Sequence, residues 1–187
     1  KVGSKGKVFS FEFEAENIKV FKKNLEFNQT LASNIEIKQL AIWDKSNEEL
    51  EFSNGGPGTS VFHNDGENLL KVKTISIDDF VKNENLDSVD LIKMDIEGAE
   101  EMMLNGCSEL LQNKRPILMI EIEKRHNRNM ENTLQLITKH GYGCFHFSPS
   151  TYEMVEYTEI NELQETKNEG TMAYINNFIF IPKEKVS

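Results

Sequence analysis

Two carboxylates follow apolar stretches of the sequence, in positions where they could take up a proton or bind a cation. The run 89–94 predicts a short buried strand, and Asp95 comes directly after it. The apolar run 117–122 predicts another buried strand and carries Glu121 near its end. On neighbouring strands, both carboxylates would lie at the edge where open α/β sheets bind ligands. Asp95 is therefore our first candidate for a base or a substrate-positioning group, and Glu121 is the second.

A third carboxylate, Glu12, lies near the end of the first predicted strand, which covers residues 7–13. A carboxylate in this position can accept hydrogen bonds from both hydroxyls of a ribose, as happens in dinucleotide sites. The alternative is an acidic side chain that only meets solvent at the end of a strand.

Basic side chains near these acids give weaker candidates. His126 follows the strand that carries Glu121 and could act as a base, although histidines are common in surface loops. Lys93 precedes Asp95 by two residues and is expected to pair with a buried acid. The remaining histidines lack the spacing of metal ligands; they are His63, His140 and His146.

The elements that would position these residues alternate between strands and helices. A helix is predicted from Asn17, which could cap it, and the strand 35–43 follows, so the chain opens with a βαβ unit. Segments 49–52 and 72–77 alternate as a pair of strands would, with the glycine-rich loop 53–66 between them. We interpret this loop as a cover over a cleft. It does not match a phosphate-binding loop, because the Gly-Lys-Ser/Thr ending and a following helix pattern are missing.

The second half of the chain continues the alternation. A helix from about residue 97 would place one apolar face inward, formed by Met103, Leu104, Cys107, Leu110 and Leu111. After the strand at 117–122 we expect a helix around Leu134 and Ile137, a short strand at 144–147, a loop at 152–170 and a closing strand at 172–181. The predicted fold is α/β, with a doubly wound, mostly parallel sheet and a β-hairpin insertion.

Composition limits the classes of function. The 187 residues suit a single domain, and 38% hydrophobic and 28% charged residues are ordinary for a soluble globular protein. The net charge of −10 argues against binding to nucleic acid or to an anionic membrane surface. The two cysteines, Cys107 and Cys144, fit the core, and a cytoplasmic location is expected. Apolar runs stay well below the ~20 residues that span a bilayer.

Residues 91–100, Leu-Ile-Lys-Met-Asp-Ile-Glu-Gly-Ala-Glu, resemble the signature of the FkbM family of S-adenosylmethionine-dependent methyltransferases. The resemblance extends over roughly residues 7–182 in the same order of parts. Its further matches are Phe11-Glu12, Asn24, Asn28, Ala41, Asp44, Pro116, Glu121 and 177–182. Phe13 stands where the family has a proline after its glutamate.

The resemblance implies the class I methyltransferase fold, in which a seven-stranded, mostly parallel sheet lies between helices and the last strand is antiparallel. The family's first strand and its glycine-rich loop, which holds the methionine end of the cofactor, do not match any of these residues. We therefore expect the chain to be N-terminally truncated, with the missing strand belonging between the strand at Val8 and the strand at Val89. On its own the chain should bind cofactor weakly, and its open strand edges should seek partners.

The resemblance also implies roles for individual residues. S-adenosylmethionine is the expected cofactor, with O-methylation of a hydroxyl on a sugar or natural product as the reaction and a small-molecule or glycan acceptor as the partner. The implied cofactor-binding residues are Glu12, Phe13, Ala41, Ile42, Asp44 and Asp95, and the catalytic candidates are Asp95, Glu121 and His126. A divalent metal is not expected to be required. Trp43 either stacks on the purine or belongs to the core.

Two other functions stay open on the sequence. A metal-dependent enzyme could use Asp95, Glu97 and Glu121 on a doubly wound sheet, although such chemistry has no need for a ribose acceptor at Glu12. A non-catalytic binding module or an inactive remnant would fit the absence of the glycine-rich loop. The oligomeric state and the acceptor cannot be predicted from these residues.

Overall fold

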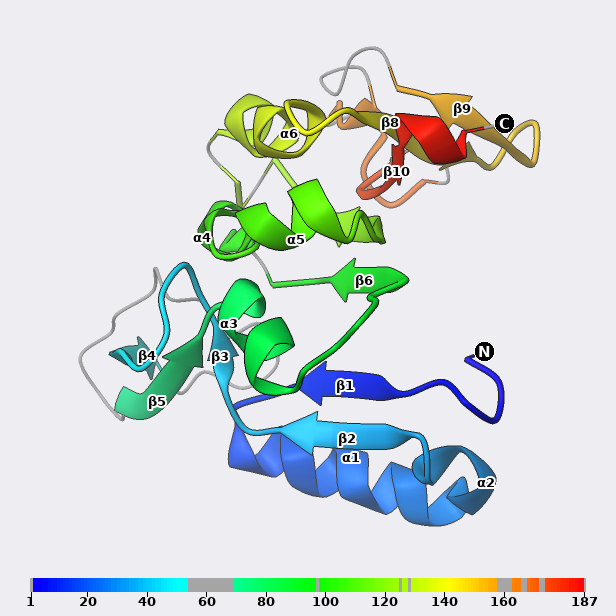
Figure 1. The fold of residues 1–187 in the computed structure, drawn as a ribbon. Helices are drawn as coiled ribbons and strands as arrows, with labels where there is room; N and C mark the ends of the chain where they lie inside the picture. The colour runs from blue at the N-terminus through cyan, green and yellow to red at the C-terminus, as the bar shows by residue number, and fades with distance from the viewer. Residues whose placement is uncertain are drawn as a thin grey trace.

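The computed structural model describes residues 2–53, 69–96, 98–124, 126–127, 129–157, 163–165, 168–171 and 174–186. These residues form a mixed α/β structure whose strands pair in three sheets (Figure 1). Figure 1 shows the two-stranded sheet at the bottom, the hairpin sheet at the left and the five-stranded sheet above them. Among the described residues, no helix is both long and apolar enough to cross a bilayer.

The first sheet is the predicted βαβ unit. Strands β1 (Val8–Phe11) and β2 (Ile35–Lys38) pair in parallel, and α1 (Ala15–Phe27) and α2 (Gln29–Ala32) connect them. The helix begins two residues earlier than predicted, with Glu14 at its N-cap, so the expected capping role of Asn17 is wrong. Asn17 lies inside the first turn, where its side-chain amide can reach the acids that precede the helix.

The second sheet contains the predicted hairpin. Strands β4 (Glu49–Ser53) and β5 (Leu69–Ile75) pair antiparallel, and β3 (Ala41–Ile42) joins β5 in parallel. The strand predicted over 35–43 is thus two strands in two sheets, because the chain leaves β1 after Lys38 and pairs with β5 from Ala41. The predicted cover over the cleft lies almost entirely outside the described residues.

The third sheet has the order β6-β7-β10-β8-β9. Its strands are β6 (Leu91–Met94), β7 (Ile117–Glu121), β8 (Tyr142–Ser148), β9 (Glu153–Glu156) and β10 (Asn177–Pro182). Only β6 and β7 are parallel within it, and β10 is antiparallel to β7 and β8. The loop expected at 152–170 is wrong for the residues of β9, which pairs with β8 although its sequence has no strand pattern.

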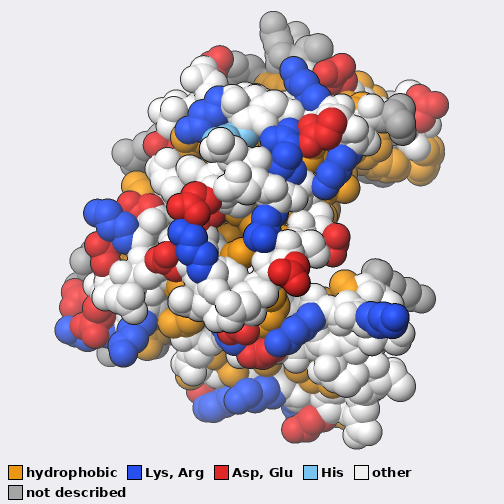
Figure 2. All heavy atoms as spheres, in the orientation of Figure 1, with side chains coloured by type: hydrophobic (Ala, Val, Ile, Leu, Met, Phe, Trp, Pro, Cys, Tyr) orange, Lys and Arg blue, Asp and Glu red, His pale blue; other side chains and the backbone are white. Residues whose placement is uncertain are grey.

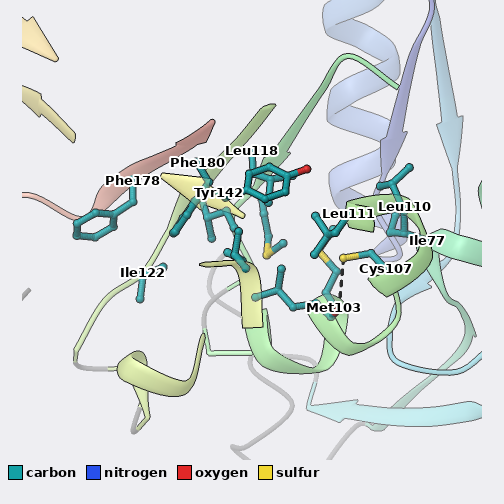
Figure 3. Packing of buried hydrophobic residues seen from close by; sticks show 14 of the residues in the cluster. Ile77, Met103, Cys107, Leu110, Leu111, Leu118, Ile122, Tyr142, Phe178 and Phe180 are labelled. Carbon is teal, nitrogen blue, oxygen red and sulfur yellow. Dashed lines mark hydrogen bonds between the residues drawn. The ribbon is translucent and has the colours of Figure 1, made fainter. Parts of the chain in front are cut away.

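Four helices accompany this sheet, and their apolar faces form the main core. They are α3 (Ile77–Asn83), α4 (Glu100–Asn105), α5 (Ser108–Asn113) and α6 (Met130–Thr138). All five residues of the predicted face 103–111 are buried, and Figure 3 shows four of them packed together. They belong to two helices and, for Cys107, to the N-cap of the second, because the chain turns at Gly106, where an added Cβ would lie 2.3 Å from the carbonyl oxygen of Trp43. Cys107 and Cys144 are buried free thiols, as expected.

A single continuous sheet, as the resemblance implied, is not formed by the described residues. β1 pairs with β2 and β6 pairs with β7, while no described strand lies between β1 and β6. Both strands run in the same direction in Figure 1, and Figure 2 shows the molecular face hollowed at the right between the parts that contain them. The doubly wound parallel sheet is therefore replaced by separate parallel and mixed sheets. The physical reason is that β1 and β6 lack a strand that would join them by hydrogen bonds.

Candidate active site

Asp95 and Glu121 lie side by side at the ends of two parallel strands. The register of β6 and β7 pairs Met94 with Ile120, so the next residue on each strand is one of the two acids. Paired residues of adjacent strands project from the same face. The two carboxyl groups come within hydrogen-bonding reach of each other. The structure thus brings together the two acids that the sequence singled out.

The pKa values of these two neighbouring acids are shifted in opposite directions. Burial raises the pKa of Glu121 to about 7, and the hydrogen bond and negative charge of Asp95 add to that effect. Burial also opposes ionisation of Asp95, but hydrogen bonds with Glu121 and Lys93 outweigh it and hold the pKa of Asp95 below its ordinary value. The arrangement keeps Asp95 ionised and lets Glu121 exchange a proton near neutral pH.

Lys93 is the cation beside this pair. Its Nζ lies 3.1 Å from Oδ2 of Asp95 and donates to the carbonyl oxygen of Met94 at 3.3 Å. The expected pairing with an acid is therefore seen, but the acid is not buried, because 54% of the Asp95 side chain is exposed. Lys93 supplies the positive charge that favours the ionised form of Asp95.

Two polar residues that we had not selected complete the group around Glu121. The Nδ2 of Asn176 donates to Oε1 of Glu121 at 2.5 Å and to Oε1 of Glu123 at 3.0 Å. Alternation along the strand would have placed Glu121 and Glu123 on one face. The sequence offered no comparable indication for Asn176, because an amide inside an apolar run does not show which side chains it will bind.

His126 meets this group through Glu123. Its Nε2 lies 3.7 Å from Oε2 of Glu123, and 40% of the His126 side chain is exposed. The loop that carries His126 packs closely on the turn after Asp95. A Cβ added to Gly98, whose φ is +87°, would lie 2.8 Å from the carbonyl oxygen of His126. Glycine is needed at this point for both the left-handed conformation and the close approach.

Glu100 fastens the same turn from inside the protein. The side chain is buried, with 2% exposed, and its Oε1 accepts the backbone N–H of Gly98 at 2.8 Å. Its Oε2 accepts Nδ2 of Asn127 at 3.0 Å, and the same nitrogen donates to Thr133 Oγ1 at 2.9 Å. The last glutamate of the 91–100 stretch therefore holds the turn after Asp95 against the loop of His126. It does more than complement the dipole of α4.

Glu12 lies at the end of β1 with both carboxylate oxygens held. Oε1 accepts the backbone N–H of Glu14 at 2.8 Å, and Oε2 accepts Nδ2 of Asn17 at 3.2 Å. An ionised carboxylate offers about four lone-pair positions, so each oxygen can accept one more hydrogen bond. The half-buried carboxylate is thus held in one orientation by the chain itself and keeps acceptor capacity on both oxygens.

The other predicted cofactor residues lie mainly in apolar packing. Ala41 is buried in the hairpin core with Phe52, and the ring of Phe13 stacks on Phe52 at 4.4 Å between centroids. Ile42 packs against the main core, whereas Asp44 is half-buried just beyond β3. Of the predicted cofactor residues, Glu12, Asp44 and Asp95 are those with polar side chains at or just beyond the carboxyl ends of strands.

No group of three or more histidine, cysteine or acidic side chains is arranged to hold a metal ion within the part of the chain that the structure describes. Glu97, the third acid of the metal-dependent alternative, lies outside that part.

Comparison with known proteins identifies the family. Residues 1–144 match the model of the methyltransferase FkbM domain. The chain belongs to the FkbM methyltransferase family. The search of curated proteins found no match.

A solved structure shares the fold of this FkbM-family chain. It is the crystal structure of the methyltransferase FkbM from Methylobacillus flagellatus KT, with a TM-score of 0.56 and 15% sequence identity. The match covers 94% of this chain and 36% of that chain, so this chain spans about a third of that protein's length. At this identity the likeness concerns the fold alone.

Proposed function

We propose that this chain provides the catalytic edge of an S-adenosylmethionine-dependent O-methyltransferase that acts on a hydroxyl of a sugar or natural product. The observation that carries the proposal is the position of Glu121 beside Asp95 at the ends of two parallel strands, where burial, together with the hydrogen bond and charge of Asp95, raises the pKa of Glu121 to about 7. Efficient general bases have pKa values near the pH at which they operate. The family of the chain and the oriented carboxylate of Glu12 support the choice of cofactor.

The chain's residues divide the work of the reaction. Bound S-adenosylmethionine would supply a methyl group on a positively charged sulfur, ready for displacement. Glu12 would accept hydrogen bonds from the ribose hydroxyls and so fix the cofactor at the carboxyl end of β1. Glu121 would take the proton of the acceptor hydroxyl while the acceptor oxygen bonds to the methyl carbon and the bond between that carbon and sulfur breaks, with its electrons left on sulfur. Asp95 would remain ionised beside Lys93. The transferred proton would therefore stay on Glu121 and would not move to Asp95.

Positioning would supply much of the rate. Holding two reactants in line is worth about 7–11 kcal/mol in favourable cases, and this benefit does not depend on strong acid–base chemistry. Glu121 ranks before Asp95 as the base because its pKa is raised to about 7, whereas the pKa of Asp95 is lowered. This order is the reverse of the one that the sequence suggested. Asp95 is better suited to orient the acceptor through its exposed oxygens.

The test is transfer of a labelled methyl group from S-adenosylmethionine to a panel of sugars and hydroxylated small molecules. Glu121→Gln should lower kcat by two to four orders of magnitude, the usual contribution of a general base. Glu109→Gln is the matched control, because Glu109 is an exposed acid that pairs with Lys82 away from the site. Equal rates for Glu121→Gln and wild type, in a form of the protein that binds S-adenosylmethionine, would contradict the proposal.

A further inference from the structure

Asn176 lies directly before β10, where that strand meets the end of β7. The backbone N–H of Ile122 donates to the carbonyl oxygen of Asn176 at 2.8 Å, which places the two strand ends together. From this position a single nitrogen of the side-chain amide reaches Glu121, the last residue of β7, at 2.5 Å and Glu123, two residues beyond the strand, at 3.0 Å. One amide thus bridges two carboxylates that would otherwise repel each other.

We propose that Asn176 is a positioning residue for the base: its amide bridges Glu121 and Glu123 and holds the Glu121 carboxyl in a fixed orientation beside Asp95. This inference rests on the proposed function in so far as Glu121 is the base. The bridge itself is a property of the folded chain, so it can be tested without cofactor or acceptor.

The orientation of the amide is set from its other side. The Nδ2 of Asn177 donates to Oδ1 of Asn176 at 3.0 Å. This contact makes Oδ1 the acceptor and turns Nδ2 towards the two carboxylates. Because Nδ2 donates to Oε1 of Glu121, the second oxygen of that carboxyl is left to carry the exchangeable proton. The amide therefore selects which oxygen of Glu121 faces an acceptor hydroxyl.

The backbone around Asn176 is held independently of its side chain. Gln164 is buried, with 4% exposed, and its Nε2 donates to the carbonyl oxygens of Ile122 at 2.6 Å and Ile175 at 3.0 Å. Its Oε1 accepts the backbone N–H of Lys124 at 2.8 Å. Because Gln164 joins the ends of β7 and β10 through main-chain atoms, loss of the Asn176 amide should leave the strands in place.

The amide also bears on the charge of Glu121. Asp95 and Lys93 face Glu121 from the end of β6, Glu123 follows just after β7, and His126 reaches the group through Glu123. A hydrogen bond donated to the ionised form of an acid favours that form. The Asn176 amide thus opposes burial and the charge of Asp95, and removing it should make Glu121 harder to ionise.

Titration of the Glu121 carboxyl in the cofactor-free protein tests the bridge directly, using carboxyl-carbon NMR. In Asn176→Ala the midpoint should rise by about one pH unit, a tenfold increase in proton affinity. Asn176→Asp keeps the size of the side chain but adds a charge, so its midpoint should rise further. Asn113→Ala, at the exposed end of α5, is the matched control and should leave the midpoint unchanged.

Activity gives the second readout. If Asn176 positions the base, the rising limb of the kcat–pH profile should move to higher pH in Asn176→Ala by the same amount as the titration. A merely structural role would lower kcat equally at every pH. Unchanged titration in folded Asn176→Ala, or in Asn176→Asp if the alanine variant does not fold, would overturn the inference. If Asn176→Ala shifts the titration of Glu121 but the wild-type protein transfers no methyl group, the proposed function is refuted and the bridge is supported.

Discussion

Asp95 and Glu121 end adjacent parallel strands, and their carboxyl groups lie close enough to share a proton. Two carboxylates at this separation do not ionise independently, because the charge of one raises the cost of ionising the other. Lys93 lies beside Asp95, so the negative charge is carried by Asp95 and the proton is held by Glu121. This asymmetry is what makes a single base available near neutral pH.

The stability of the protein should fall as pH rises through the titration of Glu121. The pKa of this group is about 7 in the folded protein, against an ordinary value of 4.5 that the unfolded chain would show. Between these values the folded state holds a proton that the unfolded state has released, so raising the pH favours unfolding. Replacing Glu121 with glutamine removes this penalty. Glu121→Gln should therefore be more stable than wild type at pH 8 by about 1–3 kcal/mol.

Urea unfolding at pH 4 and pH 8 measures this difference. At pH 4 the variant and the wild type should unfold alike, because Glu121 is protonated in both states. The exposed Glu109→Gln should show little change at either pH. Equal free energies of unfolding for wild type and Glu121→Gln at pH 8 would mean that ionising Glu121 does not destabilise the folded protein. That result would contradict the raised pKa of Glu121.

Glu12 should contribute to cofactor affinity. In a full-length protein that binds S-adenosylmethionine, Glu12→Ala should weaken this binding by about 1.5–3 kcal/mol, the usual range for a hydrogen bond to a charged group. Because Glu12 also accepts the N–H of Glu14 and the amide of Asn17, the alanine variant disturbs the start of α1 as well. Glu12→Gln keeps a carbonyl acceptor and separates the two effects. Calorimetry on folded variants that shows wild-type affinity would reject the ribose-binding role.

Methyl transfer should proceed without a divalent metal. Asp95 and Glu121 share a proton and a lysine, an environment suited to an acid–base pair. Activity should therefore survive dialysis against EDTA. Activity that EDTA abolishes and Mg²⁺ restores would favour the metal-dependent alternative, with Asp95 as a ligand.

The sequence was informative where function depends on local order along the chain. Asp95 and Glu121 could be placed at one sheet edge because each follows an apolar strand pattern. The break of the 35–43 segment into two strands could not be predicted, because the residues where the partner changes, 38–41, contain no glycine, proline or other turn signal. Partner choice is a long-range property, and the same holds for Asn176, whose role depends on where β10 meets β7. β9 forms because β8 offers it a free edge, not because its own residues favour a strand.

Gly98 should be intolerant of a side chain. An alanine there would pay for the left-handed conformation, about 1–2 kcal/mol, and would also press on the carbonyl oxygen of His126. We expect Gly98→Ala to lower the free energy of unfolding by about 2–4 kcal/mol in total. Gly170→Ala is the matched control, because Gly170 has a similar φ of +73° with nothing within 4 Å of the added Cβ. It should lose only the conformational part. Equal losses in the two variants would show that the approach to His126 is not tight.

The facing edges of β1 and β6 should make the 187-residue chain associate. Unpaired N–H and C=O groups on a strand edge are templates for pairing with another chain. Leu91, on β6, is 60% exposed, which adds an apolar side chain to that edge. We therefore expect light scattering to detect dimers or larger species at concentrations of about tens of micromolar. The backbone amides of β1 that point away from β2, and those of β6 that point away from β7, should exchange with solvent quickly when the protein is dilute. Cofactor binding by this form should be weak.

A charged residue on the responsible edge should prevent that association. Leu91→Lys places the charge on β6, and Met154→Lys places it on β9, the strand at the other edge of the same sheet, where Met154 is also exposed. If the edge of β6 is responsible, Leu91→Lys should give monomers and Met154→Lys should not. The reverse result would assign the association to the β9 edge. A stable monomer that binds S-adenosylmethionine with micromolar affinity would show that a strand between β1 and β6 is not needed.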